Sequence, residues 1–375
     1  MKILEIANVD FSLKQFVLPL MKQLRQQGCE VIGASADGPL LSDLRKEGFK
    51  VVALPLSRSY SPWRNIQAFM ALVQLMRKEK PDIVHAHMPI SGILARWAAK
   101  LTGVPVIAYT GHGFLFNQPG PCFRRALSFV LEWLTGKITD IYFTVSSEEA
   151  EQARRFYIHR HTRAIGNGRD PHCFHPDIFA RRDIRKQLQV KDDDVVVVMV
   201  SRLVRHKGYP ELFAAMQHVP EALLWIVGEK LPSDHGEDLT EVFVDAEKTL
   251  GKRLRLLGYR NDVPAVLAAA DIFVLPSLFE GLPMSVIEAM LTGLPVVASD
   301  IKGCRQLVKN GVTGLLVPPG DSAGLANALN ELVQSSQKRN TMGLAGLKEA
   351  FMRYNEKNIL KNTASRLLSK GSKTR

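Results

Sequence analysis

Short apolar runs rich in valine and isoleucine alternate with amphipathic stretches along nearly the whole chain, and this alternation constrains the fold more than any other feature. KILEIA at 2–7 and DIVHAH at 82–87 are typical strands, and the stretch 13–24 has apolar residues at helical spacing. Strands that alternate with helices form parallel sheets with helices on both faces. The sequence therefore predicts an α/β fold.

The alternation stops once, at IGNGRDPHCFHPD (165–177), which is rich in Gly, Pro, Asp and His and is typical of a linker. It restarts with VVVVMV at 195–200. Two such runs joined by a linker predict two doubly wound, Rossmann-like domains, which we place at 1–175 and 176–351. Because ligands of such sheets bind beyond the carboxyl ends of the strands, we expect the site in a cleft between facing domains.

Composition excludes several classes of protein. The chain has 375 residues, of which 46% are hydrophobic and 23% charged, as in globular proteins of about two domains. No apolar run approaches the roughly 18 residues that span a bilayer, and the start lacks the features of a signal peptide. The four cysteines are scattered without a CxxC pair. We therefore expect a reduced, cytoplasmic protein.

Positive charge is concentrated in the first half and in the tail. Residues 1–175 carry 22 Lys and Arg against 14 Asp and Glu, a net charge of +8 within the total of +12. The tail 357–375 adds six basic residues and no acidic one. Zinc-finger spacing, RNP aromatics and basic-zipper heptads are missing, so nucleic acid is not an expected partner. An anionic membrane surface or a phosphate-bearing substrate is the better interpretation.

The segment VSRLVRHKGYPE (200–211) leaves a strand and enters a helix. It places Arg202 and Lys207 at the carboxyl end of that strand, where the ligand is expected. A guanidinium fork and a lysine point charge suit a diphosphate, although two solvated surface charges would give the same pattern.

A second segment, DIFVLPSLFEGLPMSVIEAM (271–290), follows the same scheme. A buried strand leads into the loop FEGLP, and a helix begins near Pro283 or Met284. Backbone N–H groups of the loop and the helix dipole favour an anion there, so Glu280 and Glu288 are expected to accept hydrogen bonds from sugar or ribose hydroxyls. The alternatives are a capping and an exposed glutamate, or the acid and base of a glycosidase, whose carboxyls lie roughly 5 to 9 Å apart.

Histidines mark the corresponding edge of the first domain. His112 stands between glycines in YTGHGFLF (109–116), at the end of a strand. His85 and His87 alternate on DIVHAH and share one face of that strand. A metal site built from this pair, or from the group at 172–175, lacks further ligands at a recognisable spacing. We therefore predict no metal and no other cofactor.

Two segments combine basic with aromatic or apolar residues, PGPCFRRALSFVLEWLTGK (119–137) and RRFYIHRHTR (154–163). They either rest on a membrane surface or are ordinary helices with one face to the core and one to solvent. Both interpretations stay open on the sequence.

Together, VSRLVRHKG, the segment 271–299, the linker GNGRDPHCFHP and NGVTGLLVPPGD (310–321) resemble the GT-B glycosyltransferases of family 4. The resemblance runs nearly from end to end. Within that family the chain is similar to enzymes that extend undecaprenyl-diphosphate-linked sugars in capsule, O-antigen or glycoprotein glycan assembly. The resemblance implies a GT-B fold, retaining transfer from a nucleotide sugar, and a final helix at about 352–370 that packs back on the first domain.

The same resemblance implies roles for individual residues. Arg202 and Lys207 bind the donor diphosphate. Glu280 contacts the donor sugar, and Glu288 takes the ribose hydroxyls. His112 lines the sugar pocket, and all of these except Glu288 are expected catalytic residues. The other implied donor-binding residues are Gly258, Arg260, Gly281, Leu282, Pro283 and Met284.

Two positions depart from the family pattern. Many members have a Gly-Gly loop after the first strand, which lets the backbone approach the phosphates, and here the chain reads NVDFSLKQF. That loop is therefore expected to serve the acceptor. The acceptor-side residues are then Asp10, Phe11, Ser12, Leu13 and His87. Gln306 stands where a glutamate is common, so no ligand is assigned to its segment.

These inferences predict a cytoplasmic hexosyl- or N-acetylhexosaminyltransferase on the inner face of the membrane. It would move a sugar from a nucleotide sugar, expected to be a UDP-sugar, to a hydroxyl of a lipid-diphosphate-linked glycan. Stabilising the charge of the leaving group matters more in this chemistry than a strong base. Three alternatives are a transferase with a soluble acceptor, a nucleotide-sugar epimerase or phosphorylase of GT-B shape, and a catalytically silent binding protein.

Overall fold

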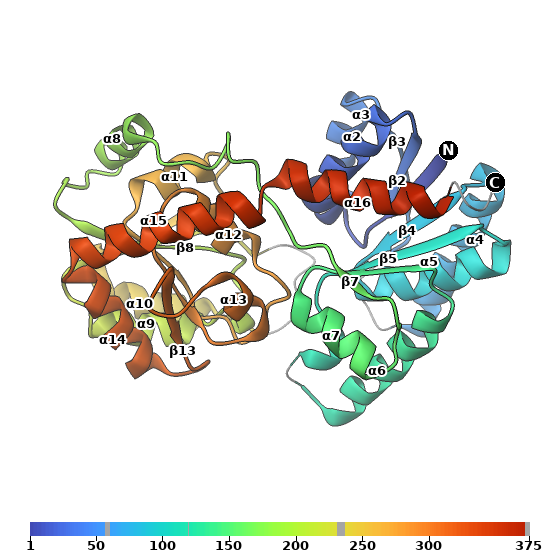
Figure 1. Ribbon diagram of the computed structural model, residues 1–375. Helices are drawn as coiled ribbons and strands as arrows, with labels where there is room; N and C mark the ends of the chain where they lie inside the picture. The colour runs from blue at the N-terminus through green and yellow to red at the C-terminus, as the bar shows by residue number, and fades with distance from the viewer. Residues whose placement is uncertain (57–60, 119, 231–236, 372–375) are drawn as a thin grey trace. The chain divides into compact units, whose positions relative to one another are not determined.

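The computed structural model describes residues 1–56, 61–118, 120–230 and 237–371 (Figure 1). Pro119, which begins the predicted segment 119–137, and the last basic residues of the tail lie outside the described residues. Two compact units make up the chain: unit 1 comprises Met1–Gly166 with Lys357–Arg375, and unit 2 comprises Asn167–Glu356. The division differs from the predicted boundary after residue 175 because the linker from Asn167 onward hydrogen-bonds within unit 2.

Unit 1 is built on a seven-stranded sheet in the order β3-β2-β1-β4-β5-β6-β7, in which every pair is parallel. The strand at the end of the order, β7, is short and was not predicted. The strands are β1 (Lys2–Ile6), β2 (Glu30–Ala36), β3 (Lys50–Leu54), β4 (Ile83–His87), β5 (Val106–Gly111), β6 (Ile141–Thr144) and β7 (Arg163–Ala164).

Helices cover both faces of this sheet, as the alternating pattern predicts. Several of them end where the sequence supplies a residue for the left-handed region, as α5 does at Gly103 (φ 70°). The helices are α1 (Asp10–Ser12), the π-helix η1 (Leu13–Val17), α2 (Leu18–Gln26), α3 (Leu41–Lys46), α4 (Pro62–Glu79), α5 (Pro89–Thr102), the 3-10 turn η2 (Leu115–Asn117), α6 (Cys122–Lys137), α7 (Ser147–Arg155) and α16 (Glu356–Gly371).

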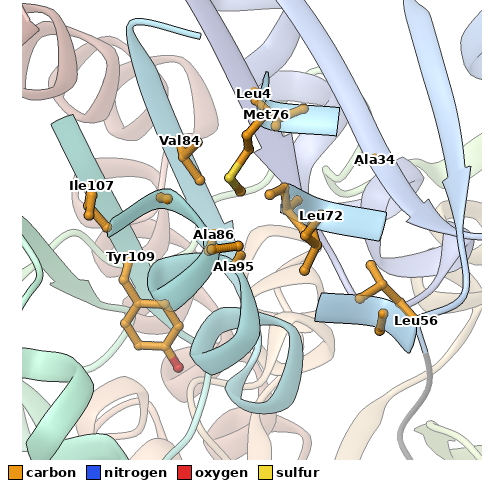
Figure 2. Close-up of a cluster of buried hydrophobic side chains, with 14 of the residues drawn as sticks. Leu4, Ala34, Leu56, Leu72, Met76, Val84, Ala86, Ala95, Ile107 and Tyr109 are labelled. Carbon is orange, nitrogen blue, oxygen red and sulfur yellow. The ribbon is translucent and has the colours of Figure 1, made fainter. Parts of the chain in front are cut away.

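Alternate residues of the strands pack into two separate cores. The core shown in Figure 2 joins the strands to α4 and α5 and includes Leu4, Ala34, Leu72, Met76, Val84, Ala95, Ile107 and Tyr109. On the other face, Ile3 and Ile83 pack with Leu13 and Met21, and with Ala364 and Leu367 of α16. The last helix therefore belongs to the core of unit 1.

Unit 2 repeats the architecture with a six-stranded sheet in the order β10-β9-β8-β11-β12-β13, again with parallel pairs. Its central strand β8 is the run VVVVMV, which is buried between helices as its continuous apolar sequence predicts. The strands are β8 (Val195–Val200), β9 (Ala222–Val227), β10 (Leu254–Gly258), β11 (Ile272–Leu275), β12 (Val296–Ser299) and β13 (Gly314–Val317).

The helices of unit 2 include two, α8 and α15, that the sequence analysis did not predict. The apolar residues of α8 are few, but Asp177 caps its first turn by accepting from Phe179 and Ala180 N–H groups. The helices are α8 (Ile178–Gln187), η3 (Arg205–Lys207), α9 (Tyr209–Gln217), α10 (Thr240–Leu250), η4 (Gly251–Arg253), α11 (Val263–Ala269), α12 (Met284–Leu291), α13 (Lys302–Leu307), α14 (Ser322–Val333) and α15 (Ser336–Arg353). Among the described helices, none combines the length and the apolar character that crossing a bilayer requires.

Candidate active site

Two loops at the carboxyl ends of β8 and β11 are held against each other in unit 2. The N–H of Leu278 donates to the carbonyl of His206 at 2.8 Å. Gly208 has φ 83°, and a Cβ atom on it would lie 2.0 Å from the carbonyl oxygen of Pro276. Only glycine allows this approach, so the HKG turn and the LPS turn form one rigid structure.

Lys207 and Glu280, both predicted site residues, form an ion pair on these loops. Lys207 Nζ lies 2.6 Å from Glu280 Oε1, and Ser277 Oγ donates to the same oxygen at 2.7 Å. The side chains are 14% and 10% exposed, so water screens the pair only weakly. A lysine held this way presents a fixed positive charge at the end of the sheet.

The helix α12 begins at Met284 with Pro283 as its N-cap residue, as the sequence predicts. The loop before it is pinned from the other side by α13, because a Cβ atom on Gly303 would lie 2.6 Å from the carbonyl oxygen of Gly281. Arg202 follows β8 by two residues and is partly exposed. The predicted donor-binding loop, Gly281–Met284, therefore lies beside the Lys207–Glu280 pair at the N-terminus of a helix.

Glu288 lies inside α12 and is bonded to a residue that the sequence analysis did not select. Arg169 Nε lies 2.6 Å from Glu288 Oε1, and Glu288 is only 7% exposed. Asn167 Nδ2 donates to the carbonyl of Leu282 at 2.8 Å. The linker GNGRD thus contacts the candidate site through Asn167 and Arg169. In the sequence, its only signal was its presence among the motifs that carry the family resemblance.

The predicted base-binding residues lie at and after the end of another strand, β10. Gly258 ends β10 with φ 65°, and the guanidinium of Arg260 binds both carboxylate oxygens of Asp262, at 2.7 and 2.5 Å. The hydrogen bond from Arg260 lowers the pKa of Asp262. Within the described residues, no hydrogen bond joins Arg260 to Lys207 or Glu280.

The buried thiol nearest to this site is not a nucleophile. Cys304 is fully buried in α13. Its burial, and then the negative charge of Glu280, raise the pKa of the thiol well above its usual value. The neutral thiol is a poor nucleophile, so Cys304 is a core residue here.

In unit 1, the predicted residues His87 and His112 belong to a buried polar cluster centred on Glu5. Glu5 lies on β1 directly opposite His85 of β4 in the strand register. Glu5 and His85 are fully buried, and His87 is 4% exposed. The carboxylate of Glu5 contacts His85 Nδ1 at 3.0 Å and His87 Nε2 at 2.8 Å. The sequence analysis predicted neither Glu5 nor its contacts, because they depend on the pairing of β1 with β4.

The ionisation of this cluster follows from its burial and its hydrogen bonds. Burial alone would raise the pKa of Glu5, but the contacts with His85 and His87 lower it to about 2. Burial, assisted by His85, lowers the pKa of His87 to about 4. Burial, with His87 and His85 nearby, lowers the pKa of His112 to about 3. At neutral pH Glu5 is therefore a carboxylate, while His87 and His112 are neutral.

Glu5, His85 and His87 also offer ligand atoms that lie within 4.8 Å of one another, the spacing of a metal site. The sequence analysis found no third ligand for the two histidines because Glu5 is 80 positions away from His85. One carboxylate and two imidazoles suit several transition metals. In the structure the same atoms instead satisfy one another by hydrogen bonds.

The predicted acceptor loop after β1 is helical and only half of it is exposed. Ser12 and Leu13 are buried, and Leu13 packs in the core of unit 1. Asp10 and Phe11 are partly exposed. The Asp10 carboxylate accepts from the N–H of Leu40 at 3.1 Å, which ties the loop to the chain after β2.

Comparison with known proteins assigns both units to a family. The family model described as "Glycosyl transferases group 1" matches residues 180–349, and that described as "Glycosyl transferase 4-like domain" matches residues 13–168. A galactosyltransferase of Escherichia coli, "UDP-Gal:alpha-D-GlcNAc-diphosphoundecaprenol alpha-1,3-galactosyltransferase", is 36% identical over 78% of this chain and 76% of its own. The chain belongs to the group 1 glycosyltransferases. The predicted family, the GT-B glycosyltransferases of family 4, is thereby confirmed, and this protein is a glycosyltransferase.

Other relatives of this glycosyltransferase match along nearly its whole length. The "Putative glycosyltransferase EpsD" of Bacillus subtilis is 28% identical over 97% of this chain and 95% of its own. Among solved structures, a sucrose-phosphate synthase of Thermosynechococcus elongatus has a TM-score of 0.84 at 22% identity, covering 98% of both chains. HepE of Anabaena, solved with UDP, has a TM-score of 0.83 at 24% identity, covering 98% of this chain and all of its own. These structures confirm the GT-B fold of the transferase, with two Rossmann-like domains.

Proposed function

We propose that this glycosyltransferase moves a hexosyl or N-acetylhexosaminyl group from a UDP-sugar to a hydroxyl of an undecaprenyl-diphosphate-linked glycan, with retention at the anomeric carbon. The bond between the anomeric carbon and the diphosphate oxygen breaks, and a bond to the acceptor oxygen forms. The observation that carries the proposal is the Lys207–Glu280 pair beside the N-terminus of α12.

The chemistry of these residues supports a nucleotide-sugar donor. Lys207 and Arg202 neutralise the negative charge that develops on the departing diphosphate, and the N–H groups at the start of α12 do the same without moving. When the diphosphate binds Lys207, Glu280 becomes available to accept hydrogen bonds from the sugar hydroxyls. No metal is needed in this scheme, because Arg202 and Lys207 supply the positive charge.

The remaining contacts are assigned to residues outside these two loops. Glu288, oriented by Arg169, takes the ribose hydroxyls. Gly258 and Arg260 contact the base, with Asp262 holding the guanidinium of Arg260 in place. His112 contacts the sugar, and Asp10 and Phe11 serve the acceptor, because these residues of unit 1 expose surface at the carboxyl ends of its strands.

Two relatives support the lipid-linked acceptor. The Escherichia coli galactosyltransferase acts, by its name, on a diphosphoundecaprenol-linked sugar. A relative from Campylobacter jejuni, named as an "N,N'-diacetylbacillosaminyl-diphospho-undecaprenol alpha-1,3-N-acetylgalactosaminyltransferase", is 26% identical over 95% of both chains. A soluble acceptor is the second candidate, and no feature of the described residues of unit 1 favours it specifically.

An apolar and basic surface on unit 1 supports a place at the membrane. Helix α5 contacts both α4 and α6. We call their outer side the α4–α6 surface. Its exposed apolar residues are Trp63, Ile66, Met70, Trp97, Leu101, Phe123, Leu127, Val130, Trp133 and Leu134. The exposed basic residues of the same three helices are Arg64, Arg77, Lys78, Lys100, Arg125 and Lys137.

An exposed mixture of large apolar and basic side chains suits an anionic lipid surface, because aromatic rings enter the interface while cations meet the head groups. Phe123 is 78% exposed and Trp63 is 68% exposed, which is unusual for such residues in a helix that packs on a core. The predicted segment 119–137 supplies half of this surface. In the segment 154–163, Phe156 and Tyr157 are also exposed. We place the enzyme on the inner face of the cytoplasmic membrane.

A donor screen tests the proposed reaction. Purified enzyme is incubated with a panel of UDP-sugars, with and without a lipid extract that contains undecaprenyl-diphosphate-linked sugars, and release of UDP is measured. We expect UDP release from one sugar and only with the extract. Formation of an epimer without any acceptor would contradict a transferase, and turnover with soluble glycans alone would favour the second candidate.

Liposome flotation at low salt tests the membrane surface. We expect the wild type to float with vesicles that contain anionic lipid and the variants Phe123→Asp and Trp133→Asp to remain behind. Leu344→Asp, which changes a 67% exposed leucine on α15, is the matched control and should float like the wild type. Flotation that does not depend on anionic lipid, or equal loss in all variants, would count against the assignment.

A further inference from the structure

A chain of hydrogen bonds runs through buried residues at the carboxyl edge of the sheet in unit 1. His85 Nε2 lies 2.8 Å from Thr110 Oγ1, and its Nδ1 contacts Glu5. The second carboxylate contact of Glu5 leads to His87 Nε2 at 2.8 Å, and His87 Nδ1 lies 3.3 Å from His112 Nε2. This path of hydrogen bonds ends at His112, which is partly exposed.

The strands fix this arrangement. The register pairs Glu5 with His85 and His87 with Thr110, so the side chains of β1, β4 and β5 meet on one face. The rings of His85 and His87 lie 4.2 Å apart. Within the part of the chain that the structure describes, the carboxylate of Glu5 hydrogen-bonds only these two imidazoles.

The polarity of the chain follows from the available donors and acceptors. An ionised carboxylate only accepts, so His87 must donate to Glu5 through Nε2–H. A neutral imidazole has one donor and one acceptor, so Nδ1 of His87 is an acceptor. It can be satisfied by His112 only if His112 donates through Nε2–H. That leaves Nδ1 of His112 with a lone pair.

We propose that Glu5, acting through His87, fixes His112 as the neutral Nε2–H tautomer, so that its Nδ1 accepts a hydrogen bond from a substrate hydroxyl. Glu5 and His87 are positioning residues in this scheme, and His112 is the residue that touches the substrate. The inference rests on the proposed function for the identity of that substrate, a sugar. The tautomer of His112 does not depend on the proposed function, because it is a property of unit 1 alone.

The pKa values agree with this polarity. Burial raises the pKa of Glu5, but the electrostatic interaction with His85 and the hydrogen bonds from His85 and His87 lower it to about 2, and burial lowers the pKa of His112 to about 3. Across the neutral range the carboxylate stays an acceptor and His112 stays uncharged. Nδ1 of His112 makes no hydrogen bond to any described residue, so it is available to a ligand.

A metal ion at Glu5, His85 and His87 would give the opposite result. A metal-bound Nε2 carries no proton, so His87 would hold its proton on Nδ1 and donate it to His112 Nε2. His112 would then carry its proton on Nδ1 and present a donor to the substrate. The tautomer of His112 therefore distinguishes a hydrogen-bonded cluster from a metal site.

Nitrogen NMR of the full chain with 15N-labelled histidine measures this tautomer directly. The signals of His112 are identified by their loss in His112→Gln, and spectra are recorded at pH 7 without substrate. We expect the Nε2–H tautomer at His112, together with less than stoichiometric metal in the purified protein. An Nδ1–H tautomer, an imidazolium, or stoichiometric metal would overturn the proposal.

Two matched variants test the relay, by which we mean the hydrogen-bonded path from Glu5 through His87 to His112. His87→Phe and His85→Phe each remove one buried imidazole from β4, but only the first cuts the path to His112. In His87→Phe we expect mixed tautomers at His112 and a kcat about 10-fold lower or more, with less change in the donor KM. In His85→Phe the tautomer of His112 should be unchanged. A single unchanged tautomer in His87→Phe, or equal disturbance of His112 in both variants, would overturn the proposal.

The wild-type spectrum tests the proposed tautomer of His112 even where a variant does not fold. Failure of the proposed function gives a different result. If His112 has the expected tautomer but the protein transfers sugar from no UDP-sugar, the proposed relay stands and the proposed reaction is contradicted.

Discussion

At the scale of single residues, the site in unit 2 consists of charges that are paired before any ligand binds. Lys207 is bound to Glu280, and Arg169 is bound to Glu288. Each pair is mostly buried, so removing one partner leaves a charge that water cannot fully solvate. Such pairs hold their side chains in one geometry, which is what a site needs if it is to meet charge that develops during a reaction.

Replacing Lys207 with alanine should nearly abolish transfer. The positive charge at the leaving diphosphate is lost, and the expected fall in kcat is about 100- to 1000-fold. Steady-state UDP release measures it. Lys191→Ala is the control, because Lys191 is exposed and precedes β8 at the opposite edge of the sheet. Near-normal turnover of Lys207→Ala would rule out the diphosphate role.

Replacing Arg169 with alanine should weaken the donor more than it slows the chemistry. Glu288 keeps its place in α12 but loses the guanidinium that orients it, so the donor KM should rise about 10-fold while kcat changes less. Arg169→Lys should recover part of the loss, because a lysine restores the charge but not the planar fork. Arg353→Ala, which breaks an exposed pair with Glu349, should change neither constant.

At the scale of elements, close packing between loops fixes the positions of the residues in the candidate site. Gly208 permits contact with the turn after β11, and Gly303 permits contact with the loop before α12. The sequence indicated that glycines stand near these loops, but the neighbour that requires each glycine lies about 20 or more positions away and is brought there by the strand order.

Gly208→Ala should destabilise the protein more than Gly311→Ala. Both glycines have φ near 80°, which costs another residue about 1–2 kcal/mol. A Cβ atom at Gly311 meets nothing within 4 Å, whereas at Gly208 it meets the Pro276 carbonyl. Urea unfolding of both variants isolates the effect of the contact. Equal unfolding midpoints would show that the turn relaxes without cost.

At the scale of the whole molecule, the two units differ in charge and in their response to pH. Unit 1 contains the basic first half and the histidine cluster, and unit 2 contains the acidic and basic pairs of the proposed donor site. In unit 1 the pKa of His87 is lowered to about 4 and that of His112 to about 3. Unfolded histidine titrates near 6.5.

Acidification should therefore destabilise unit 1 selectively. Between pH 6.5 and about 4 the unfolded chain binds protons that the folded unit does not, so the free energy of unfolding falls as pH falls, by about 1.4 kcal/mol per pH unit for each histidine. Glu5 adds a further loss as pH falls from 4.5 through its pKa of about 2. Hydrogen exchange at pH 7 and 5, corrected for intrinsic rates, should show lost protection in β1 and β4. Equal change in β8 would contradict this.

The sequence by itself determined the fold class, the two-unit organisation, the strand-to-loop positions of Lys207 and Glu280, and the start of α12. These are local properties, since periodicity, helix-start residues and loop glycines act over a few positions. It also carried the family, which the comparisons confirm. The short strand β7 and the weakly apolar helix α8 escaped prediction because their local patterns are faint.

Only the tertiary structure decided which side chains touch. Arg169 reaches Glu288 across 119 positions, and Glu5 meets His85 and His87 across 80 and 82. Such contacts are set by the strand order and register, and a pattern along one chain does not contain them. For the same reason Leu13, expected on the acceptor side, is buried in the core, since the helix after β1 turns that residue toward the sheet.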